Sequence, residues 1–146
     1  GANVMAGYLG RPDLTAARID GDGWLHTGDV GHIDKDGFLY VDGRLDDVIV
    51  LADGTMVAPE ILERALGAHP AIAQALVYGM PDKRSGQVVL ACKLVLRDGT
   101  DDAAERAAID FARSLQTSDG TRIEHVEVSC EPLPVSPAGK LLRRQA

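Results

Sequence analysis

Lys140 directly follows Gly139 in the proline-rich stretch PLPVSPAGKLLRR, near the end of the chain. A lysine ammonium is a compact point charge on a flexible stem, so a loop can bring it to a site where phosphate or carboxylate charge develops. A solvated lysine near a helix C-terminus would need no such function, because cations are favoured there in any case. From the residues alone, both interpretations of Lys140 stay open.

Two short turn sequences, HTGD at 26–29 and GRLDD at 43–47, carry residue types that suit a nucleotide. The carboxylate of Asp29 could accept hydrogen bonds from both hydroxyls of a ribose, and Arg44 offers a fork of donors to hydroxyl or phosphate oxygens. Aspartate and glycine are also ordinary turn residues that need no function. The spacing alone does not decide between these interpretations.

The common catalytic signatures are missing from the sequence. It contains no GxxxxGK[ST] phosphate loop and no GxGxxG, GxSxG or HExxH motif. The four histidines are scattered, without CxxC or HxxxH spacing nearby, so we expect no metal site.

Length and composition predict a globular protein with a hydrophobic core. The chain has 146 residues, of which 45% are hydrophobic, and a formal net charge of −7, which argues against broad binding of nucleic acid or anionic membranes. No apolar stretch approaches the ~20 residues of a membrane span, and no signal peptide opens the chain. We therefore expect a cytoplasmic protein with two reduced cysteines, Cys92 and Cys130. The absence of a start methionine suggests that the chain begins inside a larger one.

Hydrophobic periodicity predicts the order of the elements. The first 29 residues read as turns with one helical turn after Pro12, followed by a meander of extended segments at 30–33, 38–41 and 47–51, with turns at 34–37 and 42–43. A helix then begins at Pro59 and ends near Gly67, followed by strands at 71–80 and 87–96. A second helix over 100–116 with Thr100 as its cap, a strand at 122–130 and a short terminal helix complete the pattern.

This order indicates an α+β fold in two unequal parts. For residues 46–146 the pattern predicts a β-hairpin and a three-stranded sheet with flanking helices, which together make a small domain of ~100 residues. Residues 1–45 are too few and too rich in glycine to bury a core of their own. We expect them to be the β-rich edge of another domain.

Five stretches of the chain, taken in order, resemble motifs of the adenylate-forming ligases, a superfamily that includes acyl-CoA synthetases, the adenylation domains of nonribosomal peptide synthetases and firefly luciferase. They are NVMAGYLGRPDLTA, GWLHTGDVGHIDKDGFLYVDGRLDDVIVLADG, VAPEILERAL, YGMPDKRSGQVVLACKLV and PLPVSPAGKLLRR. Together these stretches cover nearly the whole chain. The resemblance implies that residues 1–45 are the final segment of a large N-terminal adenylation domain and residues 46–146 the small C-terminal domain.

The resemblance also implies a role for individual residues. Asp29 matches the carboxylate that binds the ribose of AMP, and Arg44 matches an arginine near the same ribose. Asp46 matches the hinge residue about which the small domain turns. Lys140 matches the lysine needed in the first half-reaction, in which a carboxylate attacks the α-phosphate of ATP to give an acyl-adenylate and pyrophosphate.

The second half-reaction of the family transfers the acyl group to the thiol of coenzyme A. By resemblance, the hairpin with Asp53, Gly54 and Thr55 at its turn would then approach the acyl-adenylate and line the path of the thiol. Many family members carry a basic residue where this chain has Met56. The implied partner is the chain's own N-terminal domain, and the implied substrates are ATP, a carboxylic acid and CoA, with Mg²⁺ bound in that domain.

The chain departs from the complete family pattern because the glycine-, serine- and threonine-rich phosphate loop and the acyl pocket are absent from it. We therefore expect this chain alone to be inactive. The stretches GWLHTGD and VAPE favour a fatty-acid–CoA ligase. An adenylation domain that loads a carrier protein, and a non-catalytic module that docks another protein, remain as alternatives.

Overall fold

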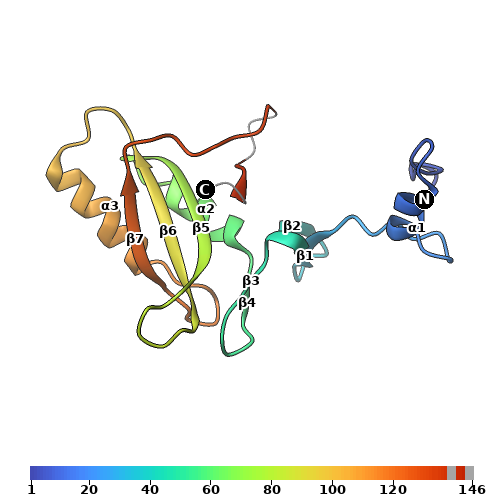
Figure 1. Cartoon of the computed structure of the whole chain (residues 1–146), viewed down its shortest axis with the longest axis horizontal. Helices are drawn as coiled ribbons and strands as arrows, with labels where there is room; N and C mark the ends of the chain where they lie inside the picture. The colour runs from blue at the N-terminus through green and yellow to red at the C-terminus, as the bar shows by residue number, and fades with distance from the viewer. Residues whose placement is uncertain (138–140, 144–146) are drawn as a thin grey trace.

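Three small sheets follow one another in the part of the chain that the computed structural model describes, residues 1–137 and 141–143 (Figure 1). Figure 1 shows the N-terminus and the first helix at one end of the molecule and the largest sheet at the other, with a hairpin between them. No described helix has both the length and the apolar composition that crossing a bilayer requires.

The N-terminal part contains helix α1 (Pro12–Arg18) and a hairpin of β1 (Asp29–Ile33) and β2 (Leu39–Arg44). The predicted turn at 34–37 is confirmed: the Asp34 carboxylate accepts hydrogen bonds from the backbone of Asp36 and Phe38, both at 2.9 Å. The expected turn at 42–43 is wrong, because β2 runs on through these residues. Gly43 pairs with Val30 of β1, and Asp42 lies at an irregularity in the register between Val41 and Gly43. The Asp42 carboxylate lies 2.8 Å from Nδ1 of His32 on β1.

This hairpin buries little apolar surface. Several of its large hydrophobic side chains are about half exposed or more: Ile33, Phe38, Leu39, Tyr40 and Val41. The members of the hydrophobic core begin only at Val57. The N-terminal residues therefore contribute little to the core of this chain, as their composition predicts.

A short 3-10 turn, η1 (Leu45–Asp47), links β2 to a second hairpin made of β3 (Ile49–Val50) and β4 (Met56–Val57). Helix α2 (Pro59–Gly67) follows with proline at its first position, where the missing N–H costs nothing. Leu62 and Leu66, four residues apart, lie on its buried face. The helix predicted from Pro59 to Gly67 is thus confirmed.

The largest sheet has the order β5 (Ile72–Pro81), β6 (Val88–Leu96) and β7 (Ile123–Ser129). β5 and β6 are antiparallel and joined by a short turn, whereas β6 and β7 are parallel. A parallel pair needs a long crossover, and α3 (Asp102–Ser114) supplies it. α2 contacts β5 and α3 contacts β7, so both helices cover the same sheet.

The hydrophobic core lies between these helices and the sheet. It contains residues from β4, both helices and all three strands: Val57, Leu62, Leu66, Ile72, Ala75, Val77, Leu90, Cys92, Leu94, Ala108, Ala112 and Ile123. The apolar runs at 71–80 and 87–96 are therefore central strands, as predicted. The α+β fold class that the sequence indicates is confirmed.

Helix α3 has a different cap from the one expected. The Asp101 carboxylate accepts a hydrogen bond of 2.8 Å from the backbone N–H of Ala104. Thr100 instead donates its hydroxyl to the carbonyl of Arg97 at 2.7 Å, within the preceding turn. Asp101 is therefore the N-cap: it accepts a hydrogen bond from a backbone N–H of the first turn, and its negative charge is favoured at a helix N-terminus.

We expect Asp101→Ala to lower the free energy of unfolding by about 1 kcal/mol, because it leaves an amide of the first turn without its acceptor. Urea denaturation of the variant and the parent protein measures this difference. Thr100→Ala is the matched control, and it should lower the free energy of unfolding by less. A larger loss in the Thr100 variant would contradict the assignment of the cap.

Candidate functional site

Asp29 and Arg44 lie directly opposite each other across the β1–β2 hairpin. Nη1 of Arg44 donates to Oδ1 of Asp29 at 2.6 Å and to the carbonyl of Thr27 at 3.0 Å. Both side chains are about two-fifths exposed, at 37% for Asp29 and 42% for Arg44. The two residues that the sequence proposes for a nucleotide thus come together as a charged pair that solvent can reach.

Gly28 allows the backbone to pass close to this charged pair. Its φ of +75° lies in the left-handed region that L side chains rarely adopt. A Cβ at this position would come within 3.1 Å of the Arg18 guanidinium and 3.2 Å of the Arg44 guanidinium. The carbonyl of Gly28 also accepts the backbone N–H of Leu45 at 2.8 Å, which ties the end of β2 to the HTGD turn.

A cavity of about 410 Å³ opens beside the charged pair. Its wall comes from the first hairpin, η1, α2 and the C-terminal segment: Asp29, Val41, Gly43, Arg44, Asp47, Glu60, Glu63, Leu141 and Arg143. We call it the hairpin–helix cavity. Four carboxylates and two guanidinium groups line it, so both signs of charge are available to a polar ligand.

Arg143 is the most firmly held cation of this wall among the described residues. It forms a two-point ion pair with Glu63, with Nη1 at 2.6 Å from Oε1 and Nη2 at 2.7 Å from Oε2. Its Nε lies 3.4 Å from a carboxylate oxygen of Asp47. Burial opposes the charge of Arg143, but the hydrogen bond and charge of Glu63, with the charges of Asp47 and Glu60, raise its pKa above the ordinary value.

Lys140 lies outside the described residues, so its predicted role stays a prediction. Its sequence neighbour Leu141 does line the hairpin–helix cavity. Leu141 forms an isolated antiparallel bridge with Val135, and the backbone N–H of Leu142 donates to the carbonyl of Pro134 at 2.9 Å. The chain that follows residues 138–140 therefore lies at the cavity that Asp29 and Arg44 also line.

Asp46 occupies the middle of η1, between the first hairpin and the rest of the chain. The flanking residues Arg44 and Val48 are both extended, with φ of −100° and −60°. Of the elements after η1, α2 makes the main contact with β2. Asp46 thus lies where two weakly connected parts meet, a location that suits a hinge.

Asp53, Gly54 and Thr55 form the turn between β3 and β4. Asp53 accepts the backbone N–H of Thr55 at 2.9 Å, and Gly54 takes a φ of +87°. The backbone hydrogen bond from Thr55, followed by its hydroxyl, lowers the pKa of the exposed Asp53. These three residues are not part of the wall of the hairpin–helix cavity. The structure therefore separates the turn from Asp29 and Arg44.

The sequence motifs contain Asp47 in GRLDD, Glu63 in VAPEILERAL and Arg143 in PLPVSPAGKLLRR, but sequence reasoning assigned none of these residues a role of its own. Glu63 resembles an ordinary surface acid of a helix. Its spacing contained a signal, because it lies four residues after Pro59 and three before Leu66, and both are buried. A carboxylate on the buried face of a helix needs a partner, which Arg143 supplies.

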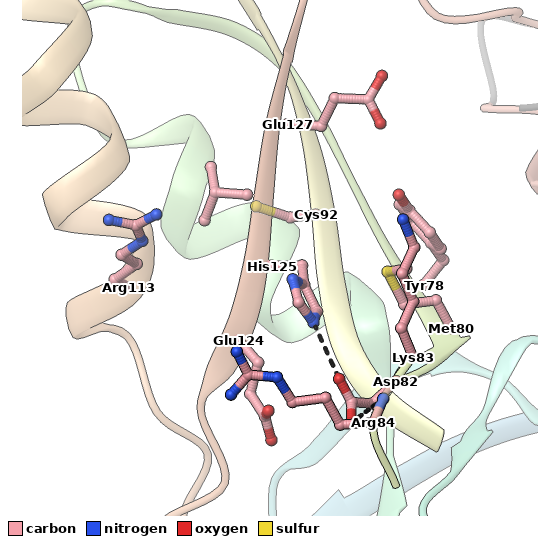
Figure 2. A pocket seen from close by; sticks show the side chains of 11 residues that line it. Tyr78, Met80, Asp82, Lys83, Arg84, Cys92, Arg113, Glu124, His125 and Glu127 are labelled. Atoms are coloured by element: carbon pink, nitrogen blue, oxygen red, sulfur yellow. Dashed lines mark hydrogen bonds and ion pairs between the residues drawn. The ribbon is translucent and has the colours of Figure 1, made fainter. Parts of the chain in front are cut away.

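A second cavity of about 700 Å³ lies at the other end of the sheet, near the β5–β6 turn (Figure 2). Figure 2 shows His125 and Asp82 pointing toward each other, with 3.8 Å between Nε2 and Oδ1. The second Asp82 oxygen accepts the backbone N–H and hydroxyl of Ser85, and these hydrogen bonds lower the pKa of Asp82. Lys83 and Arg84 add positive charge. The cavity is polar and of mixed charge.

Cys92 lies at the wall of this second cavity but belongs to the hydrophobic core. Its side chain is fully buried, and burial raises the pKa of the thiol to about 12. The thiolate is the reactive form, so Cys92 supplies no nucleophile at neutral pH. Cys130 is exposed, and both cysteines are unpaired thiols, as expected from the sequence.

We expect a thiol reagent at mildly alkaline pH to label one cysteine of the native protein quickly. Cys130 should react because it is exposed, whereas Cys92 should react only on unfolding, since its thiol is buried and protonated. Absorbance or mass spectrometry measures the labelled fraction. In the Cys130→Ser variant the native protein should stay unlabelled, and rapid labelling of that variant would contradict the burial of Cys92.

In the described residues no group of three or more histidine, cysteine or acidic side chains is arranged to hold a metal ion. The site is instead a polar cavity formed where two parts of the chain meet. A carboxylate and a guanidinium lie on one wall, and the segment that follows Lys140 lies on another.

The fold matches the C-terminal domain of adenylate-forming enzymes. The model of the AMP-binding enzyme C-terminal domain matches residues 62–140, and the chain belongs to this family. The chain is 39% identical over 143 residues to the 4-coumarate–CoA ligase-like 9 of Oryza sativa subsp. japonica, and it covers 25% of that protein. It is also 39% identical over 145 residues to the 2-succinylbenzoate–CoA ligase of Bacillus cereus, of which it covers 28%. These matches take up 98% and 99% of this chain.

The fold agrees with a solved structure of this class. The o-succinylbenzoate coenzyme A synthetase from Bacillus subtilis, in complex with ATP and a magnesium ion, superimposes with a TM-score of 0.78 at 34% identity. The match covers 99% of this chain and 28% of that protein. The chain thus spans about a quarter of the length of the relatives it matches.

Proposed function

We propose that the chain is the C-terminal part of an AMP-forming acid–thiol ligase. Residues 1–45 would be the last segment of its large N-terminal domain, and residues 46–146 its small C-terminal domain. One observation carries the proposal: Asp29, Arg44 and Leu141, the residue after Lys140, line the same cavity. The CoA ligases among the relatives support the same reaction class.

The charged pair on the first hairpin suits the nucleotide. Asp29 is exposed enough to accept hydrogen bonds from the ribose hydroxyls of ATP and of the acyl-adenylate. Arg44 fixes the orientation of the Asp29 carboxylate through its 2.6 Å hydrogen bond, and it adds donors for hydroxyl or phosphate oxygens. These two residues would hold the adenosine end of the substrate in the hairpin–helix cavity.

Lys140 would act at the reacting phosphate. A carboxylate oxygen of the acid attacks the α-phosphorus of ATP, a new P–O bond forms, and the bond to pyrophosphate breaks. Negative charge gathers between carboxylate and phosphate in the transition state, so an ammonium within reach of both lowers the barrier by differential binding. The thiol step needs no cation at that place, because its charge departs with AMP.

The two steps therefore favour two positions of the small domain. Asp46 would be the hinge between them, since it lies in the short link between the first hairpin and the remaining chain. After rotation, the turn of Asp53, Gly54 and Thr55 would replace the Lys140 segment and line the path of CoA. Its separation from the hairpin–helix cavity is consistent with this exchange.

The sequence and the relatives indicate different classes of acid. The sequence favours a fatty acid, whereas the relatives are named for 4-coumarate and 2-succinylbenzoate, which supports an acid that carries an aromatic ring. CoA is the proposed acceptor. Mg²⁺ and the acyl pocket are assigned to the upstream domain, and the chain alone is proposed to be inactive.

We expect Lys140→Ala in the full-length protein to abolish acyl-adenylate formation, because the charge that stabilises the transition state is lost. ATP–pyrophosphate exchange measures this half-reaction. Thioester formation from supplied acyl-adenylate should be largely spared. Equal loss in both half-reactions would rule out the role assigned to Lys140. If the parent protein shows no ATP–pyrophosphate exchange with any of the acids tested, the proposed ligase activity is ruled out.

We expect Asp46→Pro to impair one half-reaction more than the other, since proline fixes φ and restricts a hinge. Asp46→Ala is the matched control, because it removes the same carboxylate but leaves φ free to change. The same two half-reaction assays measure the effect. A uniform effect of the proline variant, or an equal effect of alanine, would speak against a hinge at Asp46.

A further inference from the structure

The segment after β7 folds back on itself on both sides of Lys140. Figure 1 shows it leave the end of β7 and return toward α2. Val135 and Leu141 form an antiparallel bridge, so residues 136–140 connect two paired arms. The backbone hydrogen bond from Leu142 to Pro134 joins the two arms next to this bridge. The two described arms meet at this bridge, and each arm has an anchor of its own.

The first arm is anchored on the sheet. Leu133 is 4% exposed, and its backbone N–H donates to the side-chain oxygen of Gln74 on β5 at 2.8 Å. This contact joins residues far apart in the sequence. It places the incoming arm against the sheet.

The second arm has the stronger anchor, the ion pair of Arg143 and Glu63. Two short hydrogen bonds, of 2.6 and 2.7 Å, fix both the distance and the plane of the guanidinium. The side chains are only 16% and 11% exposed, so water competes weakly for either charge. Arg143 lies three residues after Lys140, which leaves little chain between the anchor and the proposed catalytic ammonium.

Glu63 is itself held in place from a third side. Its Oε1 also accepts the backbone N–H of Val77 at 2.8 Å, and Nη1 of Arg143 lies 3.4 Å from the Val77 carbonyl. The carboxylate thus joins α2, β5 and the C-terminal arm at one point. Asp47, on η1, adds a longer contact of 3.4 Å to Nε of Arg143.

We propose that Arg143 and Glu63 are positioning residues: their ion pair fixes Leu141, the residue next to Lys140 in the sequence, at the wall of the hairpin–helix cavity. The inference rests on the proposed function of Lys140. A lysine that acts on a transition state must be placed within a fraction of an ångström, and the ion pair fixes the chain next to it in register. Exposed arginines elsewhere, such as Arg106 on α3, have no such role.

The test uses the full-length protein with Glu63→Gln and Arg143→Gln, singly and together. Glutamine at 63 keeps an oxygen for the Val77 amide but removes the charge that binds Arg143. We expect kcat of acyl-adenylate formation to fall about 100-fold in each single variant, with KM for ATP nearly unchanged. Thioester formation from supplied acyl-adenylate should be retained, which also reports that the protein is folded.

Because the two residues act as a unit, the double variant should lose little more than either single variant. Arg143→Lys should recover part of the rate, since lysine keeps the charge but not the two-point geometry. Asp47→Asn should have a smaller effect, in keeping with its longer contact. Arg106→Gln, the matched loss of an exposed guanidinium, should leave both half-reactions at the parent rate.

Two results would overturn the proposal. One is an equal loss in both half-reactions with a lower melting temperature, which would make the pair a purely structural element. The other is an unchanged rate of adenylate formation in both single variants. If Lys140→Ala still abolishes adenylate formation selectively in that case, the positioning role fails while the proposed function stands.

Discussion

The ion pair of Arg143 and Glu63 is the interaction on which the C-terminal segment depends. Removing one partner of a buried pair typically costs about 3–5 kcal/mol, and here Asp47, 3.4 Å from Nε of Arg143, would compensate part of that loss if Glu63 were removed. An apolar pair of similar size could be as stable, so stability alone does not explain the charges. Their value lies in geometry, since a two-point bond between guanidinium and carboxylate admits one relative orientation.

That geometry links three parts of the molecule that share one cavity. The β1–β2 hairpin presents Asp29 and Arg44, α2 presents Glu63, and the C-terminal segment presents Leu141 and Arg143. The hairpin has little core of its own, whereas α2 packs into the core of the small domain. The cavity therefore lies where α2, which is packed into the core, meets a hairpin that lies outside it. In the proposed reaction, this arrangement would let a cation be delivered for one step and withdrawn for the next.

The sequence predicts most of the small domain because its local signals and tertiary packing agree. Pro59 and the spacing of Leu62 and Leu66 specify α2, and the apolar runs that contain Val77 and Cys92 specify central strands. Local signals fail where two candidates compete: Asp101 rather than Thr100 caps α3.

The candidate site was only half predictable from the sequence. Asp29 and Arg44 stand in recognisable turn motifs that a hairpin brings face to face. Glu63 and Arg143 are 80 residues apart and carry no motif that names them as partners, so their pairing emerges only from the fold. The turn expected at Asp42 fails for a related reason, because Gly43 and Arg44 continue the pairing with β1 beyond it.

The central claim is that this cavity is one half of a nucleotide site whose reacting phosphate meets Lys140. A crystal structure of the full-length protein with a non-hydrolysable acyl-adenylate analogue tests it most directly. We predict that Asp29 contacts the ribose hydroxyls and that Nζ of Lys140 lies about 3 Å from an oxygen of the phosphate or its analogue. An adenosine bound elsewhere, with Asp29 still paired only to protein groups, would contradict the account.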